Sequence, residues 1–391
     1  MTRWIAGAGA FVMSLDSMVN VAFPAMAGAF DRPPEAMRWI IIPYVFSYSL
    51  VSFFGGAVAD RIGHARVFRA GLAGSAVAFG LAAAAPAFEW LVAARILQGL
   101  AGGLVYGTAP GIITLAAPPA ERGRALGFLN ACIGFAFALG PVVAGALVGA
   151  FGWPAVFAVR VPAALAVLAW AALALPAARA VAGARTVRPA DILRGRVVVP
   201  AALAFLANAG IFAIWLLAPF YLVGVRGLGA LAAGTMFMMT PLGTTVAAPV
   251  AGRIVDRVGA RWPVAVGLAL ETVGLAVLSG AREETPIAVV AVALFSAGFG
   301  LGLFQVPNMT LVMAQFPAGQ QGAAGGLSFM ARTLGVVAGV GALSAIFAAR
   351  RPVAGFDSAF ATAFVVAAGI VAVACVASVV RSRAADGRGR L

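Results

Sequence analysis

The chain has 391 residues, of which 63% are hydrophobic and 10% are charged, whereas a soluble domain carries about 25% charged residues. A soluble core of this size cannot bury so much apolar surface, so lipid must cover part of it. The formal net charge of +14 comes from 27 arginines against 13 acids. It indicates membrane orientation and contact with anionic lipid, not nucleic-acid binding.

The predicted elements are helices that cross a bilayer. Each apolar run is close to the roughly 20 residues that a spanning helix needs, and none alternates polar and apolar residues as a membrane barrel would. In chain order the runs are 4–28, 38–59, 67–86, 88–116, 123–149, 154–177, 197–223, 229–252, 262–280, 286–314, 321–348 and 358–380. The expected fold is therefore an all-α membrane protein with twelve transmembrane helices.

The loops predict the orientation. Twelve spans place both termini on one side, and an excess of arginine in short loops marks the cytoplasmic face. The Arg-rich segments that fall on that side are 61–69, 122–124, 179–196, 253–261 and 381–390. Arg350 and Arg351 fall on the other side and are an exception. We expect a multi-pass protein of the bacterial inner membrane with both termini in the cytoplasm.

An eight-residue pattern occurs twice. The segment from Gly56 to Gly63 (GAVADRIG) returns 196 positions later, from Gly252 to Gly259 (GRIVDRVG), at the end of the second helix of each half. Two related halves around a central substrate site are typical of alternating-access transporters. We expect two pseudo-symmetric six-helix bundles, joined by an Arg-rich linker and followed by a tail. Their predicted bounds are 1–177, 178–196 for the linker, 197–380, and 381–391 for the tail.

Four motifs give the chain a family resemblance. In the first half, Gly56 to Arg66 resembles the loop motif of the major facilitator superfamily, and Leu91, Arg95, Gln98 and Gly99 resemble its helix-4 motif. The segments 140–145 (GPVVAG) and 15–24 (LDSMVNVAFP) are similar to those of drug:proton antiporters, especially a fourteen-helix branch. The central segment is too short for two more helices, so the twelve-helix count departs from that branch.

The repeated turns have two interpretations. The resemblance implies a cytoplasmic gate, in which each acid docks on the positive N-terminal end of a neighbouring helix in one access state. The alternative is a tight polar turn that obeys the positive-inside rule. The expected gate residues are Gly56, Asp60, Arg61, Gly63, Gly252, Asp256, Arg257 and Gly259.

Asp16 and Arg95 are ionisable residues within predicted spans, where such residues usually have a function. At about 1.5 Å per residue they lie at a similar depth. Pairing would offset part of their desolvation, and the Asp16 carboxyl could titrate as the hydration of a cavity changes. We expect proton coupling at Asp16 and Arg95. A permanent structural ion pair is the alternative.

Glu271 and Arg332 form a second candidate pair, in the ninth and eleventh predicted spans, 262–280 and 321–348. The ninth helix is peripheral in proteins of the resembled family. As an acid within a span, Glu271 is nevertheless predicted as a second proton or cation site. Arg160 lies near the end of its span, and we expect its side chain to reach outward to the polar interface.

Other polar, Met and aromatic side chains are expected to line a substrate cavity, because mixed walls adapt to varied amphiphiles. They are Asn20, Gln98, Tyr106, Asn130, Asn208, Trp215, Phe220, Met236, Met239, Thr240, Gln305, Asn308 and Arg332. Gly140, Pro141 and Gly145 are expected at a helix bend, where close helix packing explains them equally well.

The expected function is proton-coupled export of hydrophobic or amphiphilic small molecules such as drugs. A carrier of the same fold for an anionic metabolite or a lipid is the alternative, since the interiors of the predicted spans contain three arginines and only two acids. A membrane sensor or enzyme is remote: no metal or nucleophile constellation and no nucleotide-binding loop is present. We expect no cofactor and no metal, with the proton gradient as energy source. The expected partners are a small-molecule substrate, protons and membrane lipid, and the expected state is a monomer.

Overall fold

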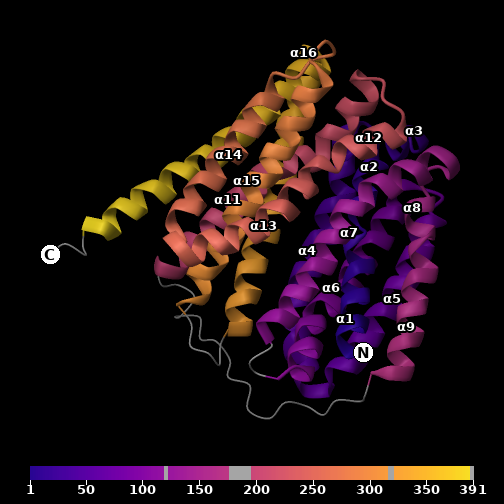
Figure 1. Cartoon of the computed structure of the whole chain (residues 1–391). Coiled ribbons are helices and arrows are strands. Elements are labelled where there is room, and N and C mark those ends of the chain that lie inside the picture. Colours follow the sequence, from indigo (N-terminus) through magenta and orange to yellow (C-terminus); the bar gives the residue numbers. More distant parts are fainter. Residues whose placement is uncertain (119–121, 176–194, 316–320, 388–391) are drawn as a thin grey trace. The chain divides into compact units, whose positions relative to one another are not determined.

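The computed structural model describes residues 1–118, 122–175, 195–315 and 321–387. Within these ranges every regular element is a helix, as Figure 1 shows. Nine of the described helices are long and apolar enough to cross a membrane. Two further helices, α4 (Arg38–Ile62) and α5 (His64–Ala83), fall outside those nine. The all-helical prediction is confirmed, and the count of twelve spans stays a prediction.

The chain divides into two compact units, and the first holds residues 1–184 together with 222–238. Besides α4 and α5 its helices are α1 (Thr2–Ser14), α2 (Ser17–Val21), α3 (Phe23–Ala29), η1 (Pro34–Met37), α6 (Phe88–Ala116), α7 (Arg122–Phe151), α8 (Ala155–Ala158), α9 (Arg160–Ala174) and α12 (Ala230–Phe237). The predicted span 88–116 coincides with α6. The predicted span 4–28 is divided among α1, α2 and α3.

The second unit holds residues 185–221 and 239–391. Its helices are α11 (Gly195–Phe220), α13 (Met239–Val258), α14 (Arg261–Ser279), α15 (Ile287–Met313) and α16 (Gln321–Gly387). A short π-helix, η3 (Tyr221–Val225), follows α11; its first residue belongs to this unit and its other four to the first. α16 is two helices in geometry, because Gly355 has non-helical angles of φ 74° and ψ 178°.

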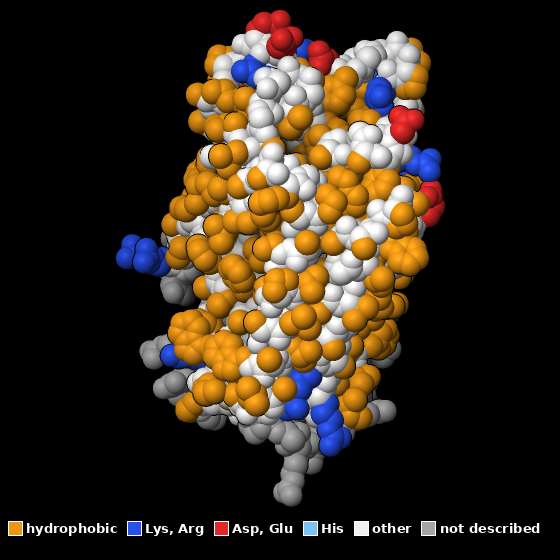
Figure 2. Space-filling model, turned by 90° about the vertical axis from the view of Figure 1, so that its right-hand side faces the viewer, with side chains coloured by type: hydrophobic (Ala, Val, Ile, Leu, Met, Phe, Trp, Pro, Cys, Tyr) orange, Lys and Arg blue, Asp and Glu red, His pale blue; other side chains and the backbone are white. Residues whose placement is uncertain are grey.

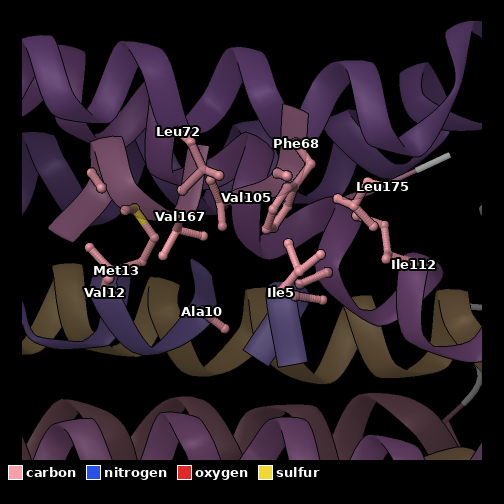
Figure 3. Close-up of a cluster of buried hydrophobic side chains, with 14 of the residues drawn as sticks. Ile5, Ala10, Val12, Met13, Phe68, Leu72, Val105, Ile112, Val167 and Leu175 are labelled. Carbon is pink, nitrogen blue, oxygen red and sulfur yellow. The ribbon is translucent and has the colours of Figure 1, made fainter. Parts of the chain in front are cut away.

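The core of the first unit lies between α1, α5, α6 and α9. In Figure 3, Ile5, Met13, Phe68, Val105 and Val167 converge from these helices on one buried apolar cluster. Other apolar residues of the same helices, among them Trp4, Val77 and Leu100, are exposed. The helices are therefore apolar on more than one side, as lipid-exposed helices are. Figure 2 shows hydrophobic side chains over most of one face, with charged groups mainly towards the top and bottom of the view.

Glycine allows several of these helices to approach closely. A Cβ built on Gly99 of α6 would lie 2.5 Å from the carbonyl oxygen of Tyr44 in α4. A Cβ on Gly71 of α5 would lie 2.8 Å from the carbonyl oxygen of Ala101 in α6. Small residues at helix contacts are typical of membrane bundles. Here they bring the backbones of α4, α5 and α6 into close contact.

The two copies of the repeat end their helices in the same way. Gly63 follows α4 with φ 100°, and Gly259 follows α13 with φ 78°. Their N–H groups donate to the carbonyls four residues earlier, of Ala59 at 2.8 Å and Val255 at 2.9 Å. Only glycine adopts such positive φ values without strain. The sequence repeat is therefore also a repeat of local structure.

Candidate functional site

Asp16 lies at a break in the first predicted span. α1 ends at Ser14 and α2 begins at Ser17. Around the break the backbone changes to bonds between residues three apart: Asp16 N–H donates to the Met13 carbonyl at 3.2 Å, and Val19 N–H to the Asp16 carbonyl at 3.0 Å. Such tightening frees carbonyl groups from the regular helical pattern. The break thus presents backbone acceptors beside a carboxylate.

Arg95 of α6 binds the Asp16 carboxylate with both terminal nitrogens. Nη1 donates to Oδ1 at 2.5 Å and Nη2 to Oδ2 at 2.8 Å. Gln98, one turn later, donates from Nε2 to Asp16 Oδ1 at 2.8 Å and accepts from Arg95 Nη1 at 2.7 Å. Arg95 Nε donates to the Ile40 carbonyl of α4 at 3.1 Å. Two parallel hydrogen bonds fix the orientation of the guanidinium against the carboxylate and make the pair stronger than a single bond would.

Arg160, at the start of α9, is the second guanidinium on this carboxylate. Its Nη1 donates to Asp16 Oδ1 at 3.0 Å, and its Nη2 donates to the Met13 carbonyl at 3.3 Å. The side chain is 0% exposed. The expectation that Arg160 reaches outward is wrong, because the short helix α8 places the start of α9 inside the unit. An arginine within an apolar run was the sequence signal for this role.

Aromatic rings cover both guanidinium groups. Arg95 Cζ lies 3.8 Å from the ring centroid of Tyr44, and Arg160 Cζ lies 4.0 Å from that of Phe79. A cation over an aromatic face is stabilised by the ring quadrupole, more so when desolvated. Tyr106 adds a hydrogen bond to Ser14 Oγ at 2.9 Å. The cluster therefore joins α1, α4, α5, α6 and α9.

The cluster carries more positive than negative charge. Asp16 is 13% exposed, whereas Arg95 and Arg160 are 2% and 0% exposed. One carboxylate thus serves two buried guanidinium groups, leaving a formal charge of +1. Breaking such a buried network by removing one partner is costly, because the remaining charge has no compensation.

The predicted bend residues of α7 are packing residues in the structure. A Cβ on Gly140 would collide with Ser17 Oγ of α2, next to Asp16. A Cβ on Gly145 would lie 2.5 Å from the Ala230 carbonyl of α12, and one on Gly234 of α12 would collide with the Pro141 carbonyl. α7 therefore contacts the break near Asp16 on one side and α12 on another.

The predicted cavity residues do not form a single group. Gln98 and Tyr106 belong to the Asp16 network. Asn208 donates within its own helix to the Ala204 carbonyl at 2.8 Å, and Asn308 donates to the Pro200 carbonyl at 2.9 Å. Thr240 is 1% exposed, with no hydrogen-bond partner for Oγ1. The other predicted residues range from buried to exposed; they are Asn20, Asn130, Trp215, Phe220, Met236, Met239, Gln305 and Arg332.

Glu271 of α14 is 0% exposed, and neither of its carboxyl oxygens has a hydrogen-bond partner. The suggested pair with Arg332 is therefore not formed. Glu271 is instead enclosed by packed helices, because a Cβ on Gly300 of α15 would collide with its backbone nitrogen.

The gate prediction falls partly outside the described residues. The side chains at 56, 60, 61 and 256 are not described, so Gly56, Asp60, Arg61 and Asp256 stay predictions. Arg257 is exposed and Gly252 half-buried. Within the described ranges no group of three or more His, Cys, Asp or Glu side chains could hold a metal ion.

Comparisons with known proteins agree with this architecture. The family model of the Major Facilitator Superfamily matches residues 5–340 and 233–390. The riboflavin transporter RibZ of Clostridioides difficile is 24% identical over 393 residues, covering 87% of this chain and 86% of the relative. The tetracenomycin C resistance and export protein of Streptomyces glaucescens is 27% identical over 404 residues, covering 88% and 74%.

A solved structure shares the fold. The crystal structure of the nucleoside transporter NupG, as its D323A mutant, matches with a TM-score of 0.78 at 13% identity, covering 97% of this chain and 99% of that one. At this identity the likeness concerns the fold alone. The family match spans most of the sequence, and the chain therefore belongs to the Major Facilitator Superfamily and is a membrane-spanning transporter of that family.

Proposed function

We propose that the protein is a proton-coupled antiporter that exports hydrophobic or amphiphilic small molecules. The two six-helix halves at 1–177 and 197–380 would alternate access to a substrate site, with both termini and the linker in the cytoplasm. The tetracenomycin C relative is an export protein by name, and the riboflavin relative transports an aromatic compound. The first name is consistent with export, and the second with a large amphiphilic substrate, since riboflavin joins an aromatic ring system to a polar chain.

The observation that carries the coupling proposal is the presence of two acids inside hydrophobic spans. Asp16 lies at the break between α1 and α2 and is 13% exposed, and Glu271 lies inside α14 and is 0% exposed; the helices on either side of each acid are predominantly apolar. Ionisable groups at such depth are expensive and mark ion or proton pathways. A proton gradient needs a carboxyl that gains and loses a proton on opposite sides of the membrane, and these two are the described acids at such depth.

A second candidate function is the transport of an anionic compound. The cluster of Asp16, Arg95 and Arg160 has a surplus positive charge within the first unit. A surplus charge in a site of low dielectric attracts the opposite charge in a substrate. This observation favours an anionic metabolite or lipid over a cationic drug.

The test is transport by purified protein in proteoliposomes with an imposed pH gradient. Ethidium, riboflavin and carboxyfluorescein serve as cationic, neutral and anionic probes. We expect solute movement in the direction opposite to the proton flux, abolished by a protonophore. Movement of solute together with protons would contradict antiport, and preference for carboxyfluorescein would select the second candidate function.

A further inference from the structure

Glu271 and Asp16 have opposite surroundings, although both are acids within spans. Asp16 accepts hydrogen bonds from two guanidinium groups and from the Gln98 amide. Both oxygens of Glu271 are buried without a partner. The two carboxyl groups therefore cannot do the same work in a transport cycle.

The contact between α14 and α15 leaves little space for water around Glu271. A Cβ on Gly267 would lie 2.6 Å from the Phe304 backbone nitrogen, and one on Gly274 would lie 2.6 Å from that of Ala297. These glycines lie one turn before and one turn after Glu271, on the same face of α14. Leu268 and Leu275 on the same helix are 0% exposed. The carboxyl is thus in an apolar, closely packed place.

No described charge on a neighbouring helix compensates Glu271. α15 contains no ionisable side chain between Ile287 and Met313, and the described side chains of α11 include none. The described ionisable side chains on α14 itself, on α13 and α16, which pack against it, and just after α11 are Tyr221, Arg253, Arg257, Arg261, Arg332, Arg350, Arg351, Asp357, Cys375 and Arg381. None of them binds the Glu271 carboxyl. Cys375 reaches α14 itself, where its Sγ donates to the Ala265 carbonyl at 3.5 Å.

An ionised carboxylate without a partner is far more costly in such a place than the neutral acid. Asp16, in contrast, must stay ionised to compensate its two arginines. We infer that Glu271, and not Asp16, is the carboxyl that takes up and releases the proton, while Asp16 remains the ionised anchor of Arg95 and Arg160. This inference rests on the proposed proton coupling. In it, the described conformation holds the proton on Glu271, and release requires a conformation in which water reaches the carboxyl.

The first test measures the protonated acid directly and needs no substrate. Infrared spectra of the full chain in micelles of a detergent without ester groups, such as dodecyl maltoside, separate the carbonyl band of a neutral carboxylic acid from the bands of carboxylates. At neutral pH we expect the neutral-acid band in the wild type and in D16N, and its loss in E271Q. A band that disappears in D16N and persists in E271Q would overturn the inference.

The second test asks whether that proton is coupled to transport. It uses proteoliposomes and whichever of ethidium, riboflavin and carboxyfluorescein the wild type accumulates under a pH gradient. We expect E271Q to lose gradient-driven accumulation down to the level of empty liposomes while solute exchange without a gradient continues. The control is E89Q, an exposed acid in a surface ion pair with Arg32, which should accumulate the probe as the wild type does.

The outcomes separate the two proposals. Accumulation by E271Q at the wild-type level would overturn the inference and leave antiport intact. No gradient-driven accumulation of any probe by the wild type would count against antiport, while the infrared band would still decide which acid holds a proton. If E271Q does not fold, E271M replaces it, because an apolar side chain of similar length suits the dry surroundings of α14.

Discussion

Asp16 and Arg160 are 144 positions apart in the sequence, yet Arg160 Nη1 donates to Asp16 Oδ1 at 3.0 Å. The contact joins the break in the first predicted span to the start of α9. It changes the meaning of the pair between Asp16 and Arg95, because the carboxylate must then balance two guanidinium groups. Loss of the carboxylate would therefore leave two buried positive charges without compensation, where an isolated pair would leave one.

Replacing Asp16 with Asn should destabilise the protein strongly. D16N removes the one carboxylate of the cluster and leaves Arg95 and Arg160 buried and uncompensated, which typically costs about 3–5 kcal/mol. Thermal unfolding in detergent, followed by helical circular dichroism, measures the change. D31N is the matched control, since Asp31 is exposed in a connection outside the cluster. Equal midpoints for D16N and D31N would contradict a compensating role for Asp16.

Replacing Arg160 with Met should change the charge preference of transport. R160M leaves Asp16 paired with Arg95 and removes the surplus positive charge. For a substrate charge about 10 Å away, a unit charge at an effective dielectric of about 20 is worth about 1.7 kcal/mol, or roughly 17-fold in affinity. Competition between carboxyfluorescein and ethidium in proteoliposomes measures the shift, which should favour the cation. R3M, a change of the same size at an exposed arginine near the N-terminus, should leave the ratio as in the wild type.

Replacing Gly145 with Ala should weaken the contact between α7 and α12. The new Cβ would lie 2.5 Å from the Ala230 carbonyl, so the helices must separate, and overpacking of this kind costs about 1–3 kcal/mol. G149A is the control on the same helix, because its Cβ would meet Ala230 Cβ at an ordinary 3.9 Å. Thermal unfolding and transport rate are the measurements. A G145A protein as stable as G149A would show that the close approach is not required.

Replacing Gly259 with Ala should cost about 1–2 kcal/mol of stability, because an L-residue at positive φ is strained. Nothing lies within 4 Å of the added Cβ, so strain is the only cause. G252A tests the opposite case, since Gly252 lies inside α13 with open space around it and Ala is favoured there by about 1 kcal/mol. Relative to the wild type, we expect the unfolding midpoint to fall in G259A and to rise in G252A. Equal shifts in the two variants would refute strain as the reason for glycine at position 259.

Depth and periodicity were enough to predict the pair of Asp16 and Arg95. A mid-span acid and a mid-span base at a similar depth have few partners other than each other, and α6 matches its predicted bounds. The division of the first span into α1, α2 and α3 could not be predicted, because hydropathy records apolar length and not backbone continuity. The burial of Arg160 is hidden from the sequence for a related reason: distance along a span indicates depth only in a continuous helix, and α8 places Arg160 inside the unit.

The surroundings of Glu271 were also beyond the sequence. The position of Glu271 within a span is enough to mark it as a functional candidate. The absence of a partner depends on how Gly267, Gly274 and Gly300 bring α14 and α15 together, which the sequence does not show. The repeat from Gly56 and from Gly252 was visible in the letters alone. Its shared helix ending at Gly63 and Gly259 required the backbone angles.

The assignment of residues 222–238 to the first unit has a consequence for how the halves can be separated. The chain passes between the units at 184–185, at 221–222 and again at 238–239. A protease cut within the linker 178–196 therefore removes one of three covalent connections of the intact chain. The C-terminal fragment would still carry α12, whose Gly234 and Ala230 contact α7 of the N-terminal fragment. Two polypeptides encoded separately on either side of that linker would thus associate through the contact between α7 and α12.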